Sequence, residues 1–450
     1  MRPDGPRWVD DVRAAAGSAV LVRFADGLEW RLAELEEAAR RSRVGPGLVF
    51  LATRADPETL AAFWAARDVG AALALFDADL APELFEALVA RFAPQTIIGW
   101  KSPLAGYETE GSTSTRLATP TPVHPGLRLL LSTSGTTGSP KLVRLDERAL
   151  RENARSIAAA LAITPEQRGA LTLPIHYAYG LSVLASHWAV GASVAFIPSG
   201  PLAAEHWATI EAAGCTSIPG VPYTWDLALK LRVPLPPRVR TLTQAGGRLR
   251  PETVRAWAEQ LKARSGAFFV MYGQTEATAR ISVLPPEESF VRPGSIGRAI
   301  PGGLLRLDQG ELVYEGPNVM WGSGETAAEL ALGDVLGGVL RTGDLGEVDP
   351  EGFFSITGRL NRFAKLVGVR INLDDVERFF AARGSGAAVS NDQRLTVYCT
   401  WGSAAELESA RAELASHLRL HPSLIVMERL EELPMLSSGK VDYRALLGGR

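Results

Sequence analysis

A run of hydroxyl and glycine residues that begins at Ser132 has the composition of a polyanion-binding loop. Glycines let backbone N–H groups turn toward one point, hydroxyls add donors, and the nearby Lys141 adds a positive charge. The apolar residues 129–131 and 142–145 on either side predict two short strands, which a flexible Gly/Ser linker would not need. We therefore predict a phosphate-binding loop made of Thr133, Ser134, Gly135, Thr136, Thr137, Gly138 and Lys141.

Two more polar turns directly follow apolar segments. Gln-Ala-Gly-Gly at 244–247 follows residues 239–243, and Tyr-Gly-Gln-Thr-Glu at 272–276 follows residues 267–271. Open α/β sheets bind ligands outside the carboxyl ends of their strands, so both turns are candidate binding elements. The second turn also carries a carboxylate, Glu276. A helix start at Thr275 explains the same residues and is compatible with a binding role.

Three further motifs lie in the last third of the chain. They are Arg-Thr-Gly-Asp at 341–344, Gly-Arg at 358–359 and Pro-x-x-x-x-Gly-Lys at 434–440. The carboxylate of Asp344 can accept hydrogen bonds from two vicinal ribose hydroxyls, although a turn residue beside Gly343 is the alternative. For Lys440 the alternative is an exposed lysine on a flexible loop.

The elements that must position these motifs alternate between strand and helix patterns. Strands are predicted at 47–53, 71–76, 96–100, 170–173, 192–197, 216–218, 239–243 and 267–271, and helices at 32–43, 57–68, 81–92, 146–162, 181–190, 202–213, 223–231 and 251–264. This alternation predicts an α/β fold of mostly parallel sheets covered by helices. Residues 101–126 are expected to form a surface connection. From residue 292 the pattern favours a small β-rich subdomain, and after 359 a compact α+β lid with helices at 373–382 and 404–418 and a strand at 395–400.

Composition narrows the class further. The chain has 450 residues, 46% hydrophobic and 22% charged, which is typical of a globular protein with two or more domains. A net charge of −3 gives no sign of a nucleic-acid or membrane-surface partner. No apolar run approaches the roughly 20 residues of a membrane span, and Cys215 and Cys399 form no metal or redox motif. With no apolar signal core at the N-terminus, we expect a cytoplasmic protein.

In order and spacing, the five motifs closely resemble those of the adenylate-forming superfamily, which includes acyl-CoA synthetases, peptide-synthetase adenylation domains and beetle luciferases. The resemblance implies binding of ATP and Mg²⁺. It places Tyr272 and Gly273 with Gly246 and Gly247 at the nucleotide, Thr275 at the α-phosphate, Glu276 at the Mg²⁺, and Asp344 and Arg359 at the ribose. Two departures are Leu142, where relatives usually have Gly, and Val270, where some have Asn. We expect backbone groups of residues 245–247 to contact the adenine instead.

The resemblance also implies a mobile lid. Residues 1–360 would form the large AMP-binding domain and 361–450 the lid, with Asn361 as the hinge, a residue type that tolerates a large backbone change. Lys440 would be the catalytic lysine, and removing such a preorganised charge typically costs about 10²–10³ in rate. After rotation of the lid, Lys365 and Gly368 would line the path of the thiol.

The acid substrate is expected to contact four residues. The resemblance places His176 at the border of the acyl site, with a capping or core histidine as the alternative, and Tyr179 and Gly180 in the acyl pocket. Residues 179–182 contain no Asp to hold an ammonium group, which argues against an α-amino acid. Arg280 is hypothesised to contact a polar or anionic group of the substrate, and a structural ion pair with a surface carboxylate is the alternative.

Together these features predict a two-step ligase. A small carboxylic acid and MgATP would give acyl-AMP and pyrophosphate, and a thiol, either CoA or the phosphopantetheine of a carrier protein, would then displace AMP. One alternative is an adenylating enzyme that transfers the acyl group to an amine or hydroxyl. The other is a non-catalytic nucleotide-binding protein that kept the fold.

Overall fold

A computed structural model describes residues 5–132, 141–203, 205–360, 362–366, 369–391, 393–418, 420–436 and 440–448. The chain divides into two compact units. The first contains Met1–Leu305 and Tyr314–Leu340, and the second contains Arg306–Val313 and Arg341–Arg450. The sequence predicts a different division, into residues 1–360 and a mobile lid of residues 361–450. This division stays a prediction.

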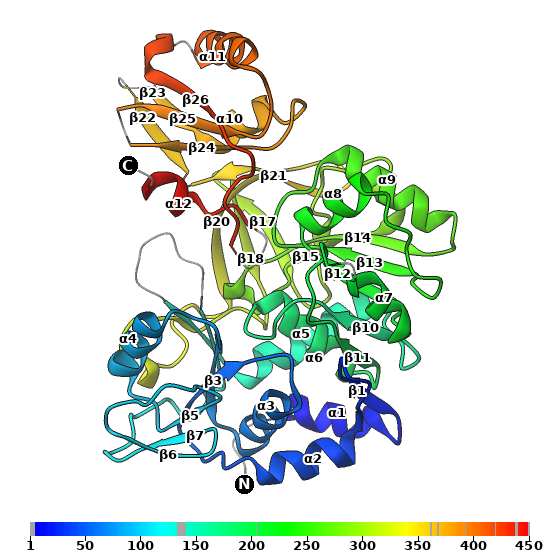
Figure 1. The fold of residues 1–450 in the computed structure, drawn as a ribbon, viewed down its shortest axis with the longest axis vertical. Helices are drawn as coiled ribbons and strands as arrows, with labels where there is room; N and C mark the ends of the chain where they lie inside the picture. The colour runs from blue at the N-terminus through cyan, green and yellow to red at the C-terminus, as the bar shows by residue number, and fades with distance from the viewer. Residues whose placement is uncertain are drawn as a thin grey trace. The chain divides into compact units, whose positions relative to one another are not determined.

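Two large sheets form the first unit (Figure 1). One has nine strands in the order β16-β15-β14-β13-β12-β10-β11-β1-β2. Its strands are β1 Val20–Arg23, β2 Glu29–Arg31, β10 Arg168–Leu171, β11 Ser193–Phe196, β12 Ser217–Gly220, β13 Thr241–Gln244, β14 Ala267–Tyr272, β15 Ser282–Leu284 and β16 Arg298–Ala299. From β14 through β13, β12, β10 and β11 to β1 the pairing is parallel, and the edges are antiparallel.

The other sheet of this unit has eight strands in the order β19-β9-β8-β4-β3-β5-β7-β6. They are β3 Leu48–Thr53, β4 Ala72–Asp77, β5 Thr96–Ile98, β6 Tyr107–Glu110, β7 Thr113–Arg116, β8 Leu129–Ser132, β9 Leu142–Leu145 and β19 Gly322–Gly324. Strands β5, β3, β4 and β8 are parallel. The strands predicted before and after the hydroxyl-rich loop therefore form the antiparallel pair β8–β9.

Helices α1 Trp8–Ala16, α2 Leu32–Arg41, α3 Pro57–Val69, α5 Glu147–Ala160 and α6 Ala178–Trp188 share one apolar core with both sheets. Other helices of the unit are α4 Pro82–Phe92, α7 Glu205–Ala212, α8 Pro222–Lys230 and α9 Pro251–Lys262, with short 3-10 turns η1 Thr275–Ala277, η2 Pro286–Ser289 and η3 Ala327–Ala331. Asp146, the first residue of the helix predicted at 146–162, caps α5 by accepting a hydrogen bond from the Ala149 N–H at 2.7 Å.

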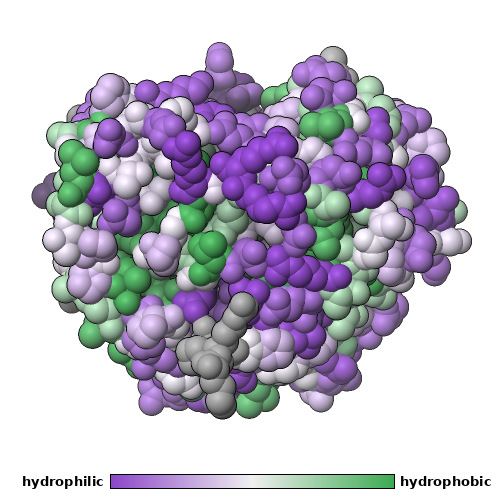
Figure 2. Space-filling model, turned by 90° about the horizontal axis from the view of Figure 1, so that it is seen from below, coloured by the Kyte–Doolittle hydropathy of each residue, from purple (hydrophilic) through white to green (hydrophobic). Residues whose placement is uncertain are grey.

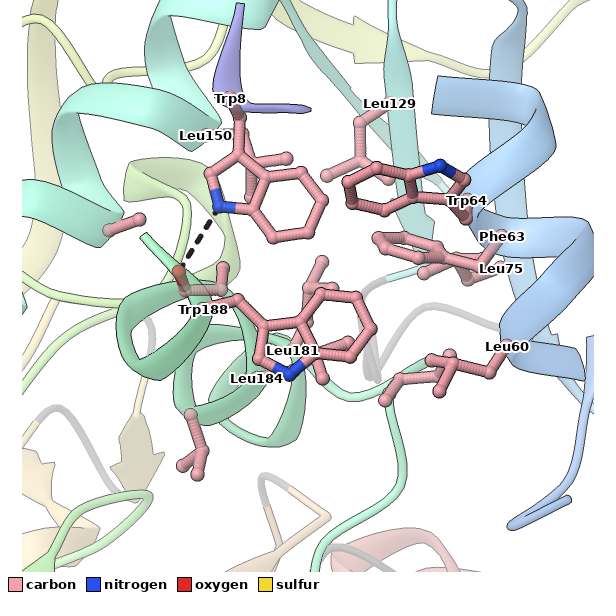
Figure 3. Close-up of a cluster of buried hydrophobic side chains, with 14 of the residues drawn as sticks. Trp8, Leu60, Phe63, Trp64, Leu75, Leu129, Leu150, Leu181, Leu184 and Trp188 are labelled. Carbon is pink, nitrogen blue, oxygen red and sulfur yellow. Dashed lines mark hydrogen bonds between the residues drawn. The ribbon is translucent and has the colours of Figure 1, made fainter. Parts of the chain in front are cut away.

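A cluster of tryptophans is the centre of this shared core (Figure 3). The rings of Trp8 and Trp188 stack with centroids 6.0 Å apart. Trp64 meets both rings edge-on, also at 6.0 Å. The Trp8 indole N–H donates to the Ala185 carbonyl of α6 at 3.1 Å. Offset and edge-on pairs of this kind add to the free energy gained by burying the rings.

The second unit contains most of a four-stranded sheet in the order β17-β18-β20-β21, formed by β17 Leu304–Asp308, β18 Glu311–Glu315, β20 Val339–Val348 and β21 Phe354–Arg359. A hairpin of β22 Phe363–Leu366 and β23 Val369–Asn372 follows. The three-stranded sheet β24-β25-β26 has strands Gly386–Ser390, Leu395–Cys399 and Ile425–Arg429. Helices α10 Leu373–Phe379, α11 Ala404–Leu418 and α12 Tyr443–Gly448 and the 3-10 turn η4 Pro422–Leu424 complete it.

The observed architecture confirms the predicted α/β class, with three differences. Residues 101–126 are more than a connection, because β6 and β7 form an edge hairpin there. Helix α6 begins at Ala178, three residues before the predicted start at 181. The sequence analysis missed α1, whose Trp8 is fully buried.

Among the residues that the structure describes, no helix is both long and apolar enough to cross a bilayer. Figure 2 shows hydrophobic residues interspersed with hydrophilic ones on the face that it presents.

Candidate functional site

The two polar turns that the sequence predicts lie at the carboxyl ends of neighbouring strands of the nine-stranded sheet. Strands β13 and β14 pair in parallel, with Gln244 opposite Val270, so the turns at 244–247 and 272–276 follow neighbouring strand ends. Gly246 has a φ of +89°, and a Cβ there would lie 2.7 Å from the Tyr177 hydroxyl. The Gln244 side chain holds the turn by donating to the Gly247 carbonyl at 2.6 Å. A larger residue than glycine would therefore disturb this turn.

The turn at 272–276 is fixed by backbone packing. Tyr272 ends β14 and is buried, and Gln274 donates to its hydroxyl at 3.2 Å. A Cβ on Gly273 would lie 1.7 Å from the Ala279 carbonyl oxygen, so only glycine fits. Thr275 and Glu276 then form the first part of the 3-10 turn η1, and the Glu276 carbonyl accepts from the Met320 N–H at 2.8 Å.

Asn318, which the sequence analysis missed, clamps the segment after this turn. Its side-chain amide donates to the carbonyls of Ala277 at 2.7 Å and Arg280 at 3.0 Å. The backbone carbonyl of Asn318 accepts a hydrogen bond from the Thr278 hydroxyl at 2.7 Å. The clamp holds a strained backbone, since Ala279 has a φ of +114°, a conformation that costs about 1–3 kcal/mol for a residue with a side chain. The polar Asn within the apolar segment 317–321 was the one available signal.

His176 lies at the ends of two parallel strands of the other sheet. Its Nδ1 is 2.8 Å from the hydroxyl of Thr53, the last residue of β3. That hydroxyl donates to the Phe76 carbonyl, so Nδ1 must carry the hydrogen, and Nε2 is the acceptor in the neutral ring. Nε2 lies 3.8 Å from Asp77 at the end of β4. Burial lowers the pKa of His176, partly offset by Asp77, so the ring is neutral near pH 7.

Helix α6 has one face on the tryptophan cluster and another on a small cavity. Leu181, Leu184 and Trp188 belong to the apolar core. The polar residues Ser182, Ser186 and His187 line the cavity, together with Tyr179, which also contacts the core. The spacing of three and four residues within each set places each set on one side of the helix. Gly180 lies against backbone, because a Cβ there would be 2.2 Å from the Pro174 carbonyl oxygen.

Arg280 points to the same cavity and is 1% exposed. Its Nη2 donates to the Ser182 hydroxyl at 3.3 Å, and its guanidinium lies 4.7 Å from the centre of the Tyr179 ring. No residue in the described ranges forms an ion pair with it, so the alternative of a structural pair with a surface carboxylate is wrong. Burial lowers the pKa of Arg280, yet an arginine side chain stays charged.

In the second unit, Asp344 and Arg359 are directly opposite each other on β20 and β21. Arg359 Nε donates to Asp344 Oδ1 at 2.9 Å. The Asp344 side chain is 3% exposed, whereas that of Arg359 is 59% exposed. The pair therefore combines a buried, oriented carboxylate with a cation that extends into solvent.

The two lysines predicted as site residues, Lys440 and Lys141, have different surroundings. The Lys440 carbonyl accepts from the Leu436 N–H at 2.8 Å, and an antiparallel bridge joins Met435 to Val441. The Lys440 side chain is half-buried. Lys141 Nζ lies 2.7 Å from Glu325, and this hydrogen-bonded pairing raises the lysine pKa.

Several predicted site residues lie outside the described residues: Thr133, Ser134, Gly135, Thr136, Thr137, Gly138, Asn361 and Gly368. Lys365 is in β22, opposite Arg370 on β23. Its side chain is not among those that the structure describes. Within the described ranges, no group of three or more His, Cys, Asp or Glu side chains could hold a metal ion alone. The donor chemistry at Glu276 fits Mg²⁺ only if phosphate oxygens complete the coordination.

The fold and the strand-end turns are those of a nucleotide-binding α/β protein. A family model described as "AMP-binding enzyme" matches residues 40–323. The chain therefore belongs to the AMP-binding enzyme family, and the predicted relation to the adenylate-forming superfamily is confirmed.

Among curated proteins, the chain is similar to sulfoacetate–CoA ligase of Cupriavidus necator, with 31% identity over 71% of this chain and 66% of that protein. It is also similar to oxalate–CoA ligase of Arabidopsis thaliana, with 27% identity over 55% of this chain and 51% of the relative. The chain spans about two thirds of the length of the first of these relatives and about half of the second.

Solved structures share the fold along nearly the whole chain. MatB from Rhodopseudomonas palustris with bound ATP has a TM-score of 0.78 and 20% identity, with 98% of each chain covered. The o-succinylbenzoate CoA synthetase MenE from Bacillus subtilis, in complex with its acyl-adenylate intermediate, has a TM-score of 0.77 and 21% identity, again with 98% of each chain covered.

Proposed function

We propose that this protein is an ATP-dependent ligase that converts a small carboxylic acid into an acyl adenylate and then into a thioester. The observation that carries the proposal is the turn at 272–276. It follows β14 beside the glycine turn of β13 and is held by backbone contacts that only Gly273 allows. Membership of the AMP-binding enzyme family supports the same function.

In the first step, a carboxylate oxygen of the acid attacks the α-phosphorus of ATP. The bond from that phosphorus to the bridging oxygen breaks, and pyrophosphate leaves with the electron pair. The loop at 133–138 with Lys141 would bind the phosphates, Thr275 the α-phosphate, and Tyr272 with the turn at 244–247 the adenine. Glu276 and phosphate oxygens would hold Mg²⁺, which neutralises phosphate charge.

Two anions must approach each other in this step, which makes positive charge the main requirement for catalysis. Lys440 is the proposed source of that charge, and Asp344 with Arg359 is the proposed ribose site. His176, neutral and oriented by Thr53, would border the acid without adding charge.

In the second step, a thiol sulfur attacks the acyl carbon, AMP leaves with the electron pair of the C–O bond, and the thiol proton is released. We propose CoA as the thiol, because several curated relatives are named as CoA ligases; a carrier-protein phosphopantetheine is the second candidate. The proposed lid of residues 361–450, with its hinge at Asn361, would bring Lys365 and Gly368 to the thiol path.

The test is product analysis after incubation with MgATP and each of a panel of acids, with and without CoA. We expect acyl adenylate and pyrophosphate when an acid is present, and AMP with an acyl-CoA mass only when acid and CoA are both present. Formation of hydroxamate with hydroxylamine but no thioester with CoA would favour transfer to an amine or hydroxyl. ATP binding without pyrophosphate release would favour the non-catalytic alternative.

Lys440→Ala provides the matched measurement. We expect it to slow acyl-adenylate formation by about 10²–10³-fold while ATP binding is retained. An unchanged rate would remove Lys440 from the mechanism. The exposed Lys101 offers a control, since Lys101→Ala removes the same charge elsewhere.

A further inference from the structure

Three arginine side chains of the first unit are almost completely buried: Arg67, Arg144 and Arg280, each 1% exposed. Burial of a charge is costly unless hydrogen bonds or an opposite charge compensate it. The three sites can therefore be compared by how far each guanidinium is satisfied by the protein itself.

Two of these guanidinium groups have strong partners. Arg67 forms an ion pair with Glu147 and donates to the Arg128 carbonyl at 2.8 Å. Arg144 donates to four backbone carbonyls between residues 321 and 333, at 2.5 to 3.4 Å. Arg67 Nε, like Arg280 Nε, has no hydrogen-bond partner among the described residues. Each of the two cations is nevertheless compensated, Arg67 by a carboxylate and Arg144 by four carbonyls, as expected for structural arginines.

Arg280 lacks such compensation. Among the described residues, the side-chain hydrogen bond of Arg280 goes to the Ser182 hydroxyl at 3.3 Å, and its guanidinium lies over the face of the Tyr179 ring. Its Nε is buried and has no hydrogen-bond partner there. Among the described residues that line the neighbouring cavity there is no Asp or Glu. A buried cation thus faces polar groups that cannot neutralise it.

The cavity itself is small and its wall is mostly apolar. Its volume is about 20 Å³, room for about one water molecule. Aliphatic residues such as Ile157 and Val183 line it together with Ser182, Ser217 and Thr243. A carboxylate is larger than this space, so its entry requires an adaptable wall residue such as Met271 to move.

Arg280 is also fixed relative to the turn at 272–276. The Ile281 N–H donates to the Tyr272 carbonyl at 2.9 Å, and the Arg280 carbonyl accepts from Asn153 and Asn318, both at 3.0 Å. A Cβ on Gly273 would lie 2.9 Å from the Arg280 Cα. The backbone of Arg280 and the proposed adenylation turn thus belong to one hydrogen-bonded segment.

We infer that Arg280 binds a second anionic group, a carboxylate or a sulfonate, at the far end of the acid substrate, so that the preferred substrate is a compact doubly charged acid. This inference rests on the proposed acid activation and specifies its substrate class. One carboxylate would react at the turn, while the second would take the place of the missing partner of Arg280. Arginine and an oxyanion can form two parallel hydrogen bonds, which are stronger when water is excluded.

The test compares acids of equal shape and different charge: malonate with malonamate, and succinate with succinamate. The readout is the ratio of kcat/KM for each diacid to that for its monoamide, measured by pyrophosphate release in wild type, Arg280→Met and Arg280→Lys. In wild type we expect kcat/KM to be higher for the diacid than for its monoamide. In Arg280→Met this ratio should fall about 30- to 1000-fold, the range for losing one partner of a buried charge pair. Arg280→Lys should keep an intermediate ratio.

Arg148→Met is the matched control, because Arg148 is an exposed arginine of α5 and its removal changes net charge equally. Its ratio should equal that of wild type. An equal ratio in wild type and Arg280→Met would overturn the inference. If Arg280→Met fails to fold, Arg280→Lys decides, since an unchanged ratio there with full activity on both acids would also contradict it.

Calorimetric titration of the same acids in the presence of AMP separates this inference from the proposed function. Diacid binding that is weakened by Arg280→Met, without pyrophosphate release from any acid, would support the anion site and contradict the ligase. Pyrophosphate release with monoacids and no effect of Arg280 on diacid binding would support the ligase and overturn the anion site.

Discussion

The two faces of helix α6 are equally buried and yet differ in kind. On one face, Leu181, Leu184 and Trp188 pack into the tryptophan cluster. On the other, Tyr179 and Ser182 face a cavity and the guanidinium of Arg280. Every residue of α6 is buried, so burial alone does not separate the two faces.

A buried charge is what separates them. The apolar face packs against neighbouring side chains from both sheets, and the polar atom left without a partner there, Trp64 Nε1, is uncharged. The other face meets the Arg280 guanidinium, whose Nε has no hydrogen-bond partner among the described residues, and an uncompensated charge is expensive in a stable interior. We infer that the apolar face serves stability and the polar face serves substrate choice, and three predictions test this difference.

The largest effect on stability is expected at Trp188. Trp188→Ala removes a fully buried ring that stacks on Trp8, so the free energy of unfolding should fall by about 3–5 kcal/mol. Urea denaturation followed by circular dichroism measures the change, and the order of preferred acids should stay the same. Leu202→Ala is the control: this side chain is 66% exposed, and its loss should change stability by less than about 0.5 kcal/mol. A changed order of acids in Trp188→Ala would contradict the separation of the two faces.

A pH effect is expected from His187 on the polar face. The ring nitrogens contact the Val183 carbonyl and the Ser217 hydroxyl, and burial lowers the pKa of His187 to about 4 from 6.5. The unfolded chain therefore takes up a proton at a higher pH than the folded protein. This contribution to stability is complete above pH 6.5 and is lost as the pH falls toward 4, by roughly 3 kcal/mol.

The measurement is the free energy of unfolding of wild type and His187→Gln between pH 4 and pH 7. Carboxylates titrate in both proteins, so the difference between the two curves isolates His187. We expect the wild-type curve to fall more steeply toward acid. Parallel curves would show that this imidazole is not held neutral by burial.

The smallest effect is expected from two serines of α6. Ser182→Ala removes the one hydroxyl that accepts from Arg280 and should cost about 1–3 kcal/mol in stability, with a measurable fall in the preference for diacids. Ser186→Ala removes a hydroxyl that donates to the Val183 carbonyl at 3.3 Å. The free energy of unfolding should fall by about 0.5–1.5 kcal/mol. Paired denaturation curves and diacid-to-monoamide ratios provide the check. Equal losses of diacid preference in both variants would argue against a specific link from Ser182 to Arg280.

Local sequence patterns predicted most of this framework. Alternating apolar segments gave the parallel sheets, and Asp146 marked the start of α5. The position of the turn at 272–276 after β14 was likewise predictable from an apolar segment followed by polar residues. These features depend on neighbours within a few residues.

Features that depend on distant contacts were not predictable in the same way. Trp8 is buried because α1 packs against α5 and α6. Its backbone N–H donates to the Glu147 carboxylate at 2.8 Å. Asn318 is separated by about forty residues from the strained turn that it clamps. The alternative of a surface ion pair for Arg280 was wrong because only the tertiary fold places that side chain under α6.

The central claim, activation of a carboxylic acid as an adenylate, is tested most directly by acid-dependent exchange of labelled pyrophosphate into ATP. The panel should contain the malonate and succinate pairs together with monocarboxylic, aromatic and amino acids. We predict label in ATP only when an acid is present, strongest with a compact diacid and reduced about 10²–10³-fold in Lys440→Ala. Absence of exchange with every acid, while the protein still binds ATP, would contradict the account.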